Sequence, residues 1–220
     1  MVKQELIERN PVRFLEKSAN GGLAAGEIGV LTSKKGLGKT SVLVQFGLDM
    51  LLQEKTVVHV SFNQHSDNVI TWYGDIFDET AKKKNLADAD EVKNSVIRNR
   101  VILNFSPDTV SAERIINTLK ALAQGGIVAS CMIVDGLDLA LLKSEDYKAL
   151  KEYGKEANLV IWFSHNVEND ASYSNSDVDC ILHLEQKPDT IQMKILKSHG
   201  TESDVASLKL DSKTLLMSEK

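Results

Sequence analysis

The segment VLTSKKGLGKTSVLV, residues 30–44, constrains the fold of this chain more than any other stretch of its sequence. Apolar runs flank a loop that holds Gly36, Gly38 and three lysines, and such flanks are typical of a buried strand followed by a helix. Glycine adopts positive φ angles freely, so the loop can turn several backbone N–H groups toward one point at the helix start. This arrangement predicts a loop that binds phosphate.

The side chains of this segment suit a nucleoside triphosphate. We expect Lys39 to reach the β- and γ-phosphates and the Thr40 hydroxyl to ligate Mg²⁺, so the predicted cofactors are ATP and Mg²⁺. The usual spacing G-x-x-x-x-G-K-[ST] has glycine where this chain has Ser33, which allows a different loop path if that position needs positive φ. An ordinary strand-to-helix turn, with Lys34 and Lys35 facing solvent, is the alternative. The predicted nucleotide-binding residues of this segment are Ser33, Lys34, Lys35, Gly36, Leu37, Gly38, Lys39, Thr40 and Ser41.

Apolar runs rich in β-branched residues alternate with segments of helical period along the chain. Expected strands lie at residues 27–32, 56–62, 100–105, 127–135 and 159–164. Expected helices lie at 39–53, 67–84, 106–126, with Ser111 or Thr109 as cap and Gly125-Gly126 at the end, and 144–157. The polar stretch 81–94 is expected to be a solvated loop or helix end.

The last part of the chain has a different pattern. DCILHLEQKPDTIQMKILK predicts two strands around a QKPD turn, and VASLKLDSKTLLM predicts another hairpin. The whole order predicts an α/β fold with a mainly parallel central sheet, helices on both faces and antiparallel strands at its C-terminal edge.

A second candidate residue follows the apolar run CMIV at residues 131–134. Asp135 ends this run, and a central strand of an open α/β sheet delivers its last residue to the edge where ligands bind. A buried strand can also end in aspartate at an ordinary turn. The pattern alone is therefore weak evidence, and the glycine-rich loop strengthens it. With that loop, it predicts that Asp135 holds Mg²⁺ through water.

Composition and charge limit the classes of partner. The 220 residues carry a net charge of −5, which disfavours binding to duplex DNA. A local basic groove that binds nucleic acid is still compatible with this charge. The start MVKQELIERNPVRF has no apolar signal region and no run reaches membrane-spanning length, so we expect a cytoplasmic protein without a membrane partner. Cys131 and Cys180 lie in apolar runs and are expected to be core thiols.

Residues 21–210 resemble the RecA-like ATPase core, closest to the branch of KaiC, RadA and the DnaB helicase. The resemblance rests on the lead-in GGLAAGE, the loop at 33–40, and the later runs CMIVDGLDL, LVIWFSHN and DVDCILHLE...IQMKILKSHG. It implies a RecA-like three-layer P-loop NTPase fold, with residues 1–220 as one nucleotide-binding domain. It also implies assembly into rings or filaments.

Several positions depart from what the resemblance implies. The glutamate that activates the attacking water in family enzymes corresponds to Asn63, which Gln64 follows. An amide cannot accept the proton, and general-base catalysis contributes typically about 10² to 10⁴ in rate. Hydrolysis should therefore be slow unless Asp67 or another acid substitutes.

Two further stretches correspond to family positions near the γ-phosphate. Ser164-His165 occupies the sensor position, where a hydrogen-bonded loop histidine is the alternative for His165. Lys197-Ser198-His199 corresponds to the cationic pair that a neighbouring subunit inserts, so the second cation is only partly charged near neutral pH. An ordinary solvated strand end is equally compatible with that stretch.

These features together predict an ATP-binding, KaiC-type regulatory protein with slow or absent hydrolysis. Its expected partners are the nucleotide and either further copies of the chain or a different protein. One alternative is an active DNA-dependent ATPase of the recombination or helicase type, and another is a scaffold that does not hydrolyse ATP.

Overall fold

The computed structural model describes residues 2–62, 64–106, 111–168, 173–199 and 201–219. Its strands are β1 (Ile28–Ser33), β2 (Val57–Ser61), β3 (Arg100–Asn104), β4 (Cys131–Asp135), β5 (Val160–Asn166), β6 (Cys180–Gln186), β7 (Ile191–Ser198), β8 (Thr201–Leu210) and β9 (Met217–Glu219). Its helices are α1 (Val2–Glu8), α2 (Pro11–Ser18), α3 (Lys39–Leu52), α4 (Ser66–Lys84), α5 (Ala89–Ile97), α6 (Ala112–Gln124), the 3₁₀ turn η2 (Leu139–Leu141) and α7 (Ser144–Glu156).

The described strands form one sheet of nine strands in the order β3-β2-β4-β5-β1-β6-β7-β8-β9. All pairs from β3 to β6 are parallel, whereas β7, β8 and β9 are antiparallel to their neighbours. The predicted α/β class, mainly parallel sheet and antiparallel C-terminal edge are therefore confirmed.

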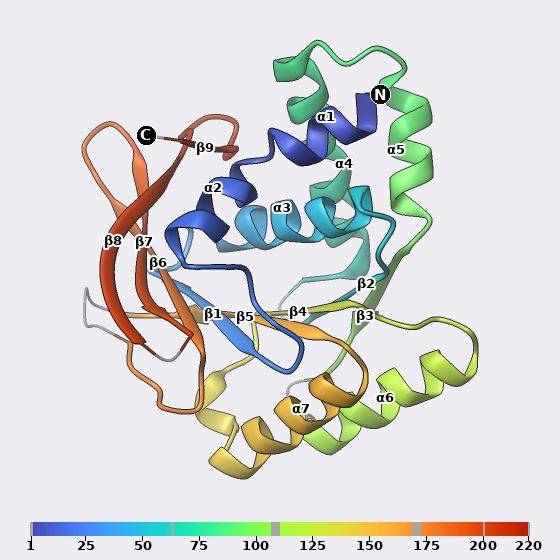
Figure 1. Ribbon diagram of the computed structural model, residues 1–220, viewed down its shortest axis with the longest axis vertical. Coiled ribbons are helices and arrows are strands. Elements are labelled where there is room, and N and C mark those ends of the chain that lie inside the picture. The colour runs from blue at the N-terminus through green and yellow to red at the C-terminus, as the bar shows by residue number, and fades with distance from the viewer. Residues whose placement is uncertain (1, 63, 107–110, 169–172, 200, 220) are drawn as a thin grey trace.

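Helices cover both faces of the sheet, with α1 to α5 on one face and α6 and α7 on the other (Figure 1). Each face has its own core, and adjacent residues of β1 enter different cores: Leu31 packs with Leu43 of α3, while Val30 packs with Leu150 of α7. A parallel strand covered on both faces needs continuous apolar residues, which explains the unbroken run in this part of the sequence.

Local sequence signals fix both ends of α6. Ser111 caps α6, because its hydroxyl accepts a hydrogen bond from the Arg114 N–H at 3.2 Å. Gly125 follows the last helical residue and Gly126 has a φ of 86°, so the helix ends where the sequence predicts. Thr109, the alternative cap, lies outside the described residues.

One predicted strand is too long. Residues 127–130 do not belong to β4, and Ile127 and Val128 are exposed. The strands on either side begin level with Cys131, which pairs with Val57 of β2 and Val160 of β5. Ser130 still forms backbone hydrogen bonds with Thr56 and Val160, whereas the Ile127 N–H bonds back to Leu122 of α6. The apolar side chains of residues 127–130 predicted a strand, but the sheet begins only at Cys131.

Leu215 and Met217, near the end of the chain, form hydrogen bonds with the first turns of α3. Both the Ser41 hydroxyl and the Gln45 side-chain amide donate to the carbonyl of Leu215 at 2.9 Å. The Gln45 amide oxygen accepts a hydrogen bond from the Met217 N–H at 2.8 Å. The predicted final hairpin forms as β8 and β9, and its connection lies beside the loop that precedes α3.

In the part of the chain that the structure covers, every helix is too short or too polar to span a lipid bilayer.

Candidate functional site

The glycine-rich loop lies between the end of β1 at Ser33 and the start of α3 at Lys39. Gly36 and Gly38 have φ angles of 87° and 92°, a region that other residues adopt with strain. A Cβ at Gly36 would meet nothing within 4 Å, so that glycine is needed for its backbone conformation and not for space. Ser33 is not among the described residues with positive φ, so serine fits this first position without backbone strain.

Lys39 folds its side chain back over the loop. Its ammonium donates to the Ser33 hydroxyl at 2.9 Å and to the carbonyls of Ser33 and Lys34 at 3.2 and 3.1 Å. The side chain is buried, and this burial lowers the pKa of Lys39, while Asp135 nearby partly opposes the shift. A buried cation that contacts three neutral oxygens would be stabilised further by an anionic ligand.

Thr40 and Asp135, the two predicted metal ligands, are in direct contact. The Thr40 hydroxyl donates to Asp135 Oδ2 at 2.7 Å, and the Ser164 hydroxyl donates to Oδ1 at 2.6 Å. The N–H of Gly136 in turn donates to the Ser164 oxygen at 2.8 Å. Asp135 ends β4 and Ser164 lies on β5, so two neighbouring parallel strands and the first turn of α3 meet at this edge.

The donor set of this cluster suits a small hard cation. The described residues contain no group of three or more His, Cys, Asp or Glu that could hold a metal by themselves. Mg²⁺ usually takes one or two carboxylates from the protein and completes its shell with phosphate oxygens and water. One carboxylate and one hydroxyl beside a cationic loop therefore fit Mg²⁺ bound together with a phosphate ligand.

Gln64 joins this cluster, which the sequence alone did not indicate. Its side-chain amide donates to the Thr40 hydroxyl oxygen at 3.3 Å. Two hydrogen bonds with Ser61 fix its backbone, since the Ser61 hydroxyl donates to the Gln64 carbonyl at 3.0 Å and accepts from the Gln64 N–H at 3.1 Å. Asn63 lies outside the described residues. Asp67, the alternative acid, is exposed on the first turn of α4 and lies 3.3 Å from His65.

His165 lies on β5 beside β1, level with Thr32. Its ring centroid is 4.7 Å from that of Tyr173. Burial lowers the pKa of His165, Asp138 partly opposes this shift, and the positive charge of Lys39 adds to it. His165 is therefore close enough to the loop to be influenced by its charge, and it favours the neutral form.

Lys197 and His199 lie near the amino ends of the parallel strands, whereas the glycine-rich loop lies at their carboxyl ends. Lys197 is level with Ile181 on β6, and its ammonium donates to the Asn175 carbonyl at 3.0 Å. His199 Nδ1 lies 3.1 Å from a carboxylate oxygen of Glu27, the residue that precedes β1. The structure thus does not bring this pair to the loop of its own chain. Each residue has a partner near its own strand end, which is compatible with the alternative of an ordinary strand end.

The other predicted residues have simpler surroundings. Lys34 and Lys35 are exposed on the loop, and Leu37 is half-buried. Ser41 is buried and its hydroxyl holds the C-terminal segment. No distinctive spacing in the sequence pointed to that contact with Leu215, which joins residues 174 positions apart.

The chain matches no protein-family model, and no curated protein matches it either.

Proposed function

We propose that this chain is a RecA-like, KaiC-type protein that binds ATP with Mg²⁺ and hydrolyses it slowly, so that nucleotide occupancy acts as a regulatory signal. The observation that carries the proposal is the 2.7 Å hydrogen bond from Thr40 to Asp135 beside the buried Lys39 ammonium. It joins the first turn of α3 to the end of β4 around a loop shaped by two glycines with positive φ.

The loop supports binding of the phosphates. A triphosphate oxygen would replace the neutral carbonyl and hydroxyl oxygens that the Lys39 ammonium now contacts. Hydrogen bonds between charged partners are about twice as strong as neutral ones. The N-terminus of the 14-residue helix α3 adds unpaired N–H groups and a favourable dipole at the same place.

The Thr40–Asp135 pair supports binding of the metal. Both oxygens are held in contact before any ligand arrives, and Ser164 fixes the second oxygen of the carboxylate. Bound Mg²⁺ would neutralise charge on the phosphate oxygens. Thr40 would offer an oxygen lone pair to the metal and could keep donating its hydrogen to Asp135, because a hydroxyl has one donor and two lone pairs.

Slow hydrolysis follows from the side chains near Thr40. The group that contacts its hydroxyl from the β2–α4 connection is the amide of Gln64, which can orient a water molecule but cannot accept its proton. Asp67 is exposed and lies beside His65, away from the buried cluster. Slow turnover leaves ATP bound for long periods, as a regulatory state requires.

Calorimetric titration with ATP, in the presence and absence of Mg²⁺, tests the proposal. Lys39→Ala should weaken ATP binding about tenfold or more, because charged hydrogen bonds contribute about 1.5–3 kcal/mol each. Lys148→Ala is the matched control, since it removes an exposed lysine from α7, on the other face of the sheet. Asp135→Asn should weaken binding mainly when Mg²⁺ is present.

Absence of ATP binding at millimolar concentration, or equal losses in the two lysine variants, would contradict the proposal. Single-turnover phosphate release with and without single-stranded DNA then separates the functional classes. Strong stimulation by DNA would favour the motor ATPase over the regulatory protein.

A further inference from the structure

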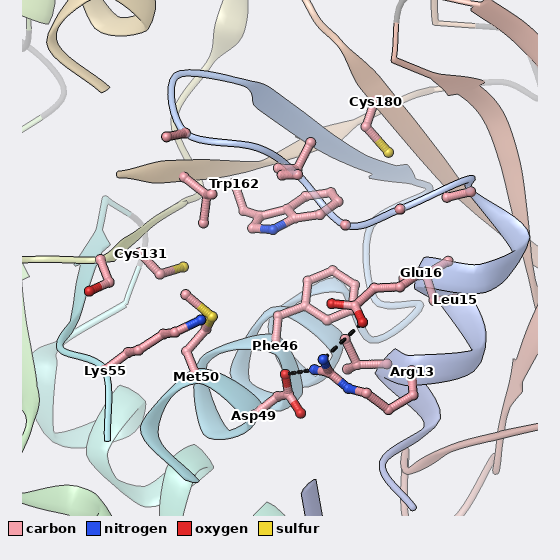
Figure 2. A pocket seen from close by; sticks show the side chains of 18 of the residues that line it. Arg13, Leu15, Glu16, Phe46, Asp49, Met50, Lys55, Cys131, Trp162 and Cys180 are labelled. Carbon is pink, nitrogen blue, oxygen red and sulfur yellow. Dashed lines mark hydrogen bonds and ion pairs between the residues drawn. The ribbon is translucent and has the colours of Figure 1, made fainter. Parts of the chain in front are cut away.

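A cavity lies at the amino ends of the parallel strands, the end opposite the glycine-rich loop, between α2, α3 and strands β4, β5 and β6 (Figure 2). Its volume is about 310 Å³, at the small end of the roughly 300–1,000 Å³ of small-molecule sites. The loop residues 34–38, Thr40 and Asp135 do not line it. A compact molecule of one or two rings is the size of ligand that this space admits.

One wall of the cavity is aromatic. The rings of Phe46 from α3 and Trp162 from β5 lie 4.8 Å apart between centroids, with an interplanar angle of 45°. Trp162 lies against Gly29 of β1, where a Cβ would come within 2.4 Å of the indole ring. The glycine therefore allows the indole to lie close to the strand. Phe46 is buried and Trp162 is half-buried, so the indole offers more aromatic surface to a ligand than Phe46 does.

The opposite wall carries two carboxylates that share one guanidinium. Figure 2 shows Arg13 between Glu16 and Asp49, with a contact of 2.8 Å to Glu16 and a hydrogen bond to Asp49 Oδ2. Asp49 is 2% exposed, and within the described part of the chain its Oδ1 has no hydrogen-bond partner. Among the described residues, the Arg13 Nε in this wall is likewise buried without a hydrogen-bond partner, so the guanidinium does not satisfy both carboxylates fully.

The pKa of Asp49 shows that its charged form is costly to bury. Burial raises its pKa to about 6; Arg13 opposes this shift, Glu16 adds to it, and Lys55 and the Gln53 amide oppose it more weakly. Lys55 is exposed and lies beside Met50, on the other side of that side chain from Arg13 (Figure 2). A further cation near Asp49 and Glu16 would offset the cost of burying this charge.

The entrance leaves one carboxylate oxygen accessible. Glu16 is about one-third exposed, and only its Oε2 contacts Arg13. A Cβ at Gly22 would lie 2.9 Å from Glu16 Oε1, so the glycine of the lead-in segment keeps the approach to this oxygen open. The lead-in thus forms part of the wall of a cavity in addition to connecting α2 to β1.

We propose that this cavity is a binding site for a small aromatic amine, with its ring against Trp162 and its protonated amino group facing Glu16 Oε1, beside the Arg13–Asp49 pair. The ammonium adds a positive charge where two carboxylates share the single Arg13 guanidinium, and the aromatic wall attracts both a ring and a nearby cation. The cavity is separate from the proposed ATP site, because none of its lining residues belongs to the glycine-rich loop.

Phenethylamine is the probe, and 3-phenylpropionate is its matched counterpart with a carboxylate in place of the ammonium. The chain has two tryptophans, so Trp162 fluorescence is isolated in a Trp72→Phe background, since Trp72 does not line the cavity. Phenethylamine should change the Trp162 emission and raise the melting temperature, whereas 3-phenylpropionate should do neither. Absence of a response to the amine, or an equal response to the acid, would overturn the proposal.

Two carboxylate variants then test the position of the amino group. Glu16→Gln should weaken phenethylamine binding about tenfold, equivalent to about 1.4 kcal/mol. Glu152→Gln, on the exposed surface of α7, is the matched control and should leave it unchanged. Equal affinities in the two variants would overturn the assignment. Lys39→Ala should retain amine binding, so failure of the nucleotide proposal would leave this result unaffected.

Discussion

Replacing Asp49 by asparagine tests which force dominates at the buried Arg13–Asp49 contact. Burial raises the pKa of Asp49 from its ordinary value of 3.8 to about 6, so desolvation outweighs the attraction of Arg13. Each pKa unit corresponds to about 1.36 kcal/mol, and a rise of about two units therefore corresponds to about 3 kcal/mol. This is a large fraction of the 5–15 kcal/mol typical of a folded domain.

The sign of the effect follows from proton linkage. A carboxyl whose pKa is higher in the folded than in the unfolded state binds its proton more tightly when folded, so stability falls as pH rises from about 4 to about 6. The penalty is absent below the unfolded pKa and complete above the folded pKa. Asparagine has no such titration, so Asp49→Asn should gain stability relative to the wild type by about 3 kcal/mol between pH 4 and pH 7.

Urea denaturation at several pH values between 4 and 7.5, followed by circular dichroism, gives the two stability curves. Asp78→Asn is the control, because it removes an exposed carboxyl that contacts Lys93 on the surface. A difference between Asp49→Asn and wild type that is independent of pH would refute the reasoning. A difference that changes in the opposite direction would show that the Arg13 ion pair outweighs desolvation.

Four further outcomes are expected. Mg-ATP at about 100 times its Kd should stabilise the fold by about 2.7 kcal/mol, and an unchanged melting curve at millimolar Mg-ATP would exclude binding. Gly38→Ala should destabilise the protein by about 1–2 kcal/mol in urea, because its φ of 92° strains any other residue; equal stability would contradict that reading. Asn63→Glu should raise single-turnover phosphate release with similar ATP affinity, whereas a wild-type rate of several per second would point to Asp67 or another base. Mg-ATP should promote oligomers in light scattering between pH 6 and 8, and a monomer throughout would remove the trans role of Lys197 and His199.

The parallel part of the sheet could be predicted because its signals are local. Val30 and Leu31 face different cores, so a strand buried on both faces must be apolar along its length. The caps of α6 are equally local, since Ser111 acts within its own first turn. The four residues before Cys131 were misassigned, because strand pairing depends on where β2 and β5 begin and not on the apolar residues themselves.

The candidate site divides in the same way. Lys39 and Thr40 follow the loop directly and Asp135 ends an apolar run, so a short spacing pattern identifies them. Gln64 reaches Thr40 only because β2 lies next to β4 in the sheet, an adjacency that the sequence order does not reveal. The contact of Arg13 with Asp49 spans 36 positions and involves α2, a helix that the sequence pattern did not predict.

Helix α3 connects the two sites that have been proposed. Its first turn carries Lys39 and Thr40, and its later turns carry Phe46 and Asp49, within a rigid element about 20 Å long at about 1.5 Å per residue. A ligand that shifts this helix at either end changes the free energy of binding at the other, and thermodynamic linkage makes the two effects equal. The coupling between nucleotide and amine can therefore be measured by titrating whichever ligand gives the clearer signal.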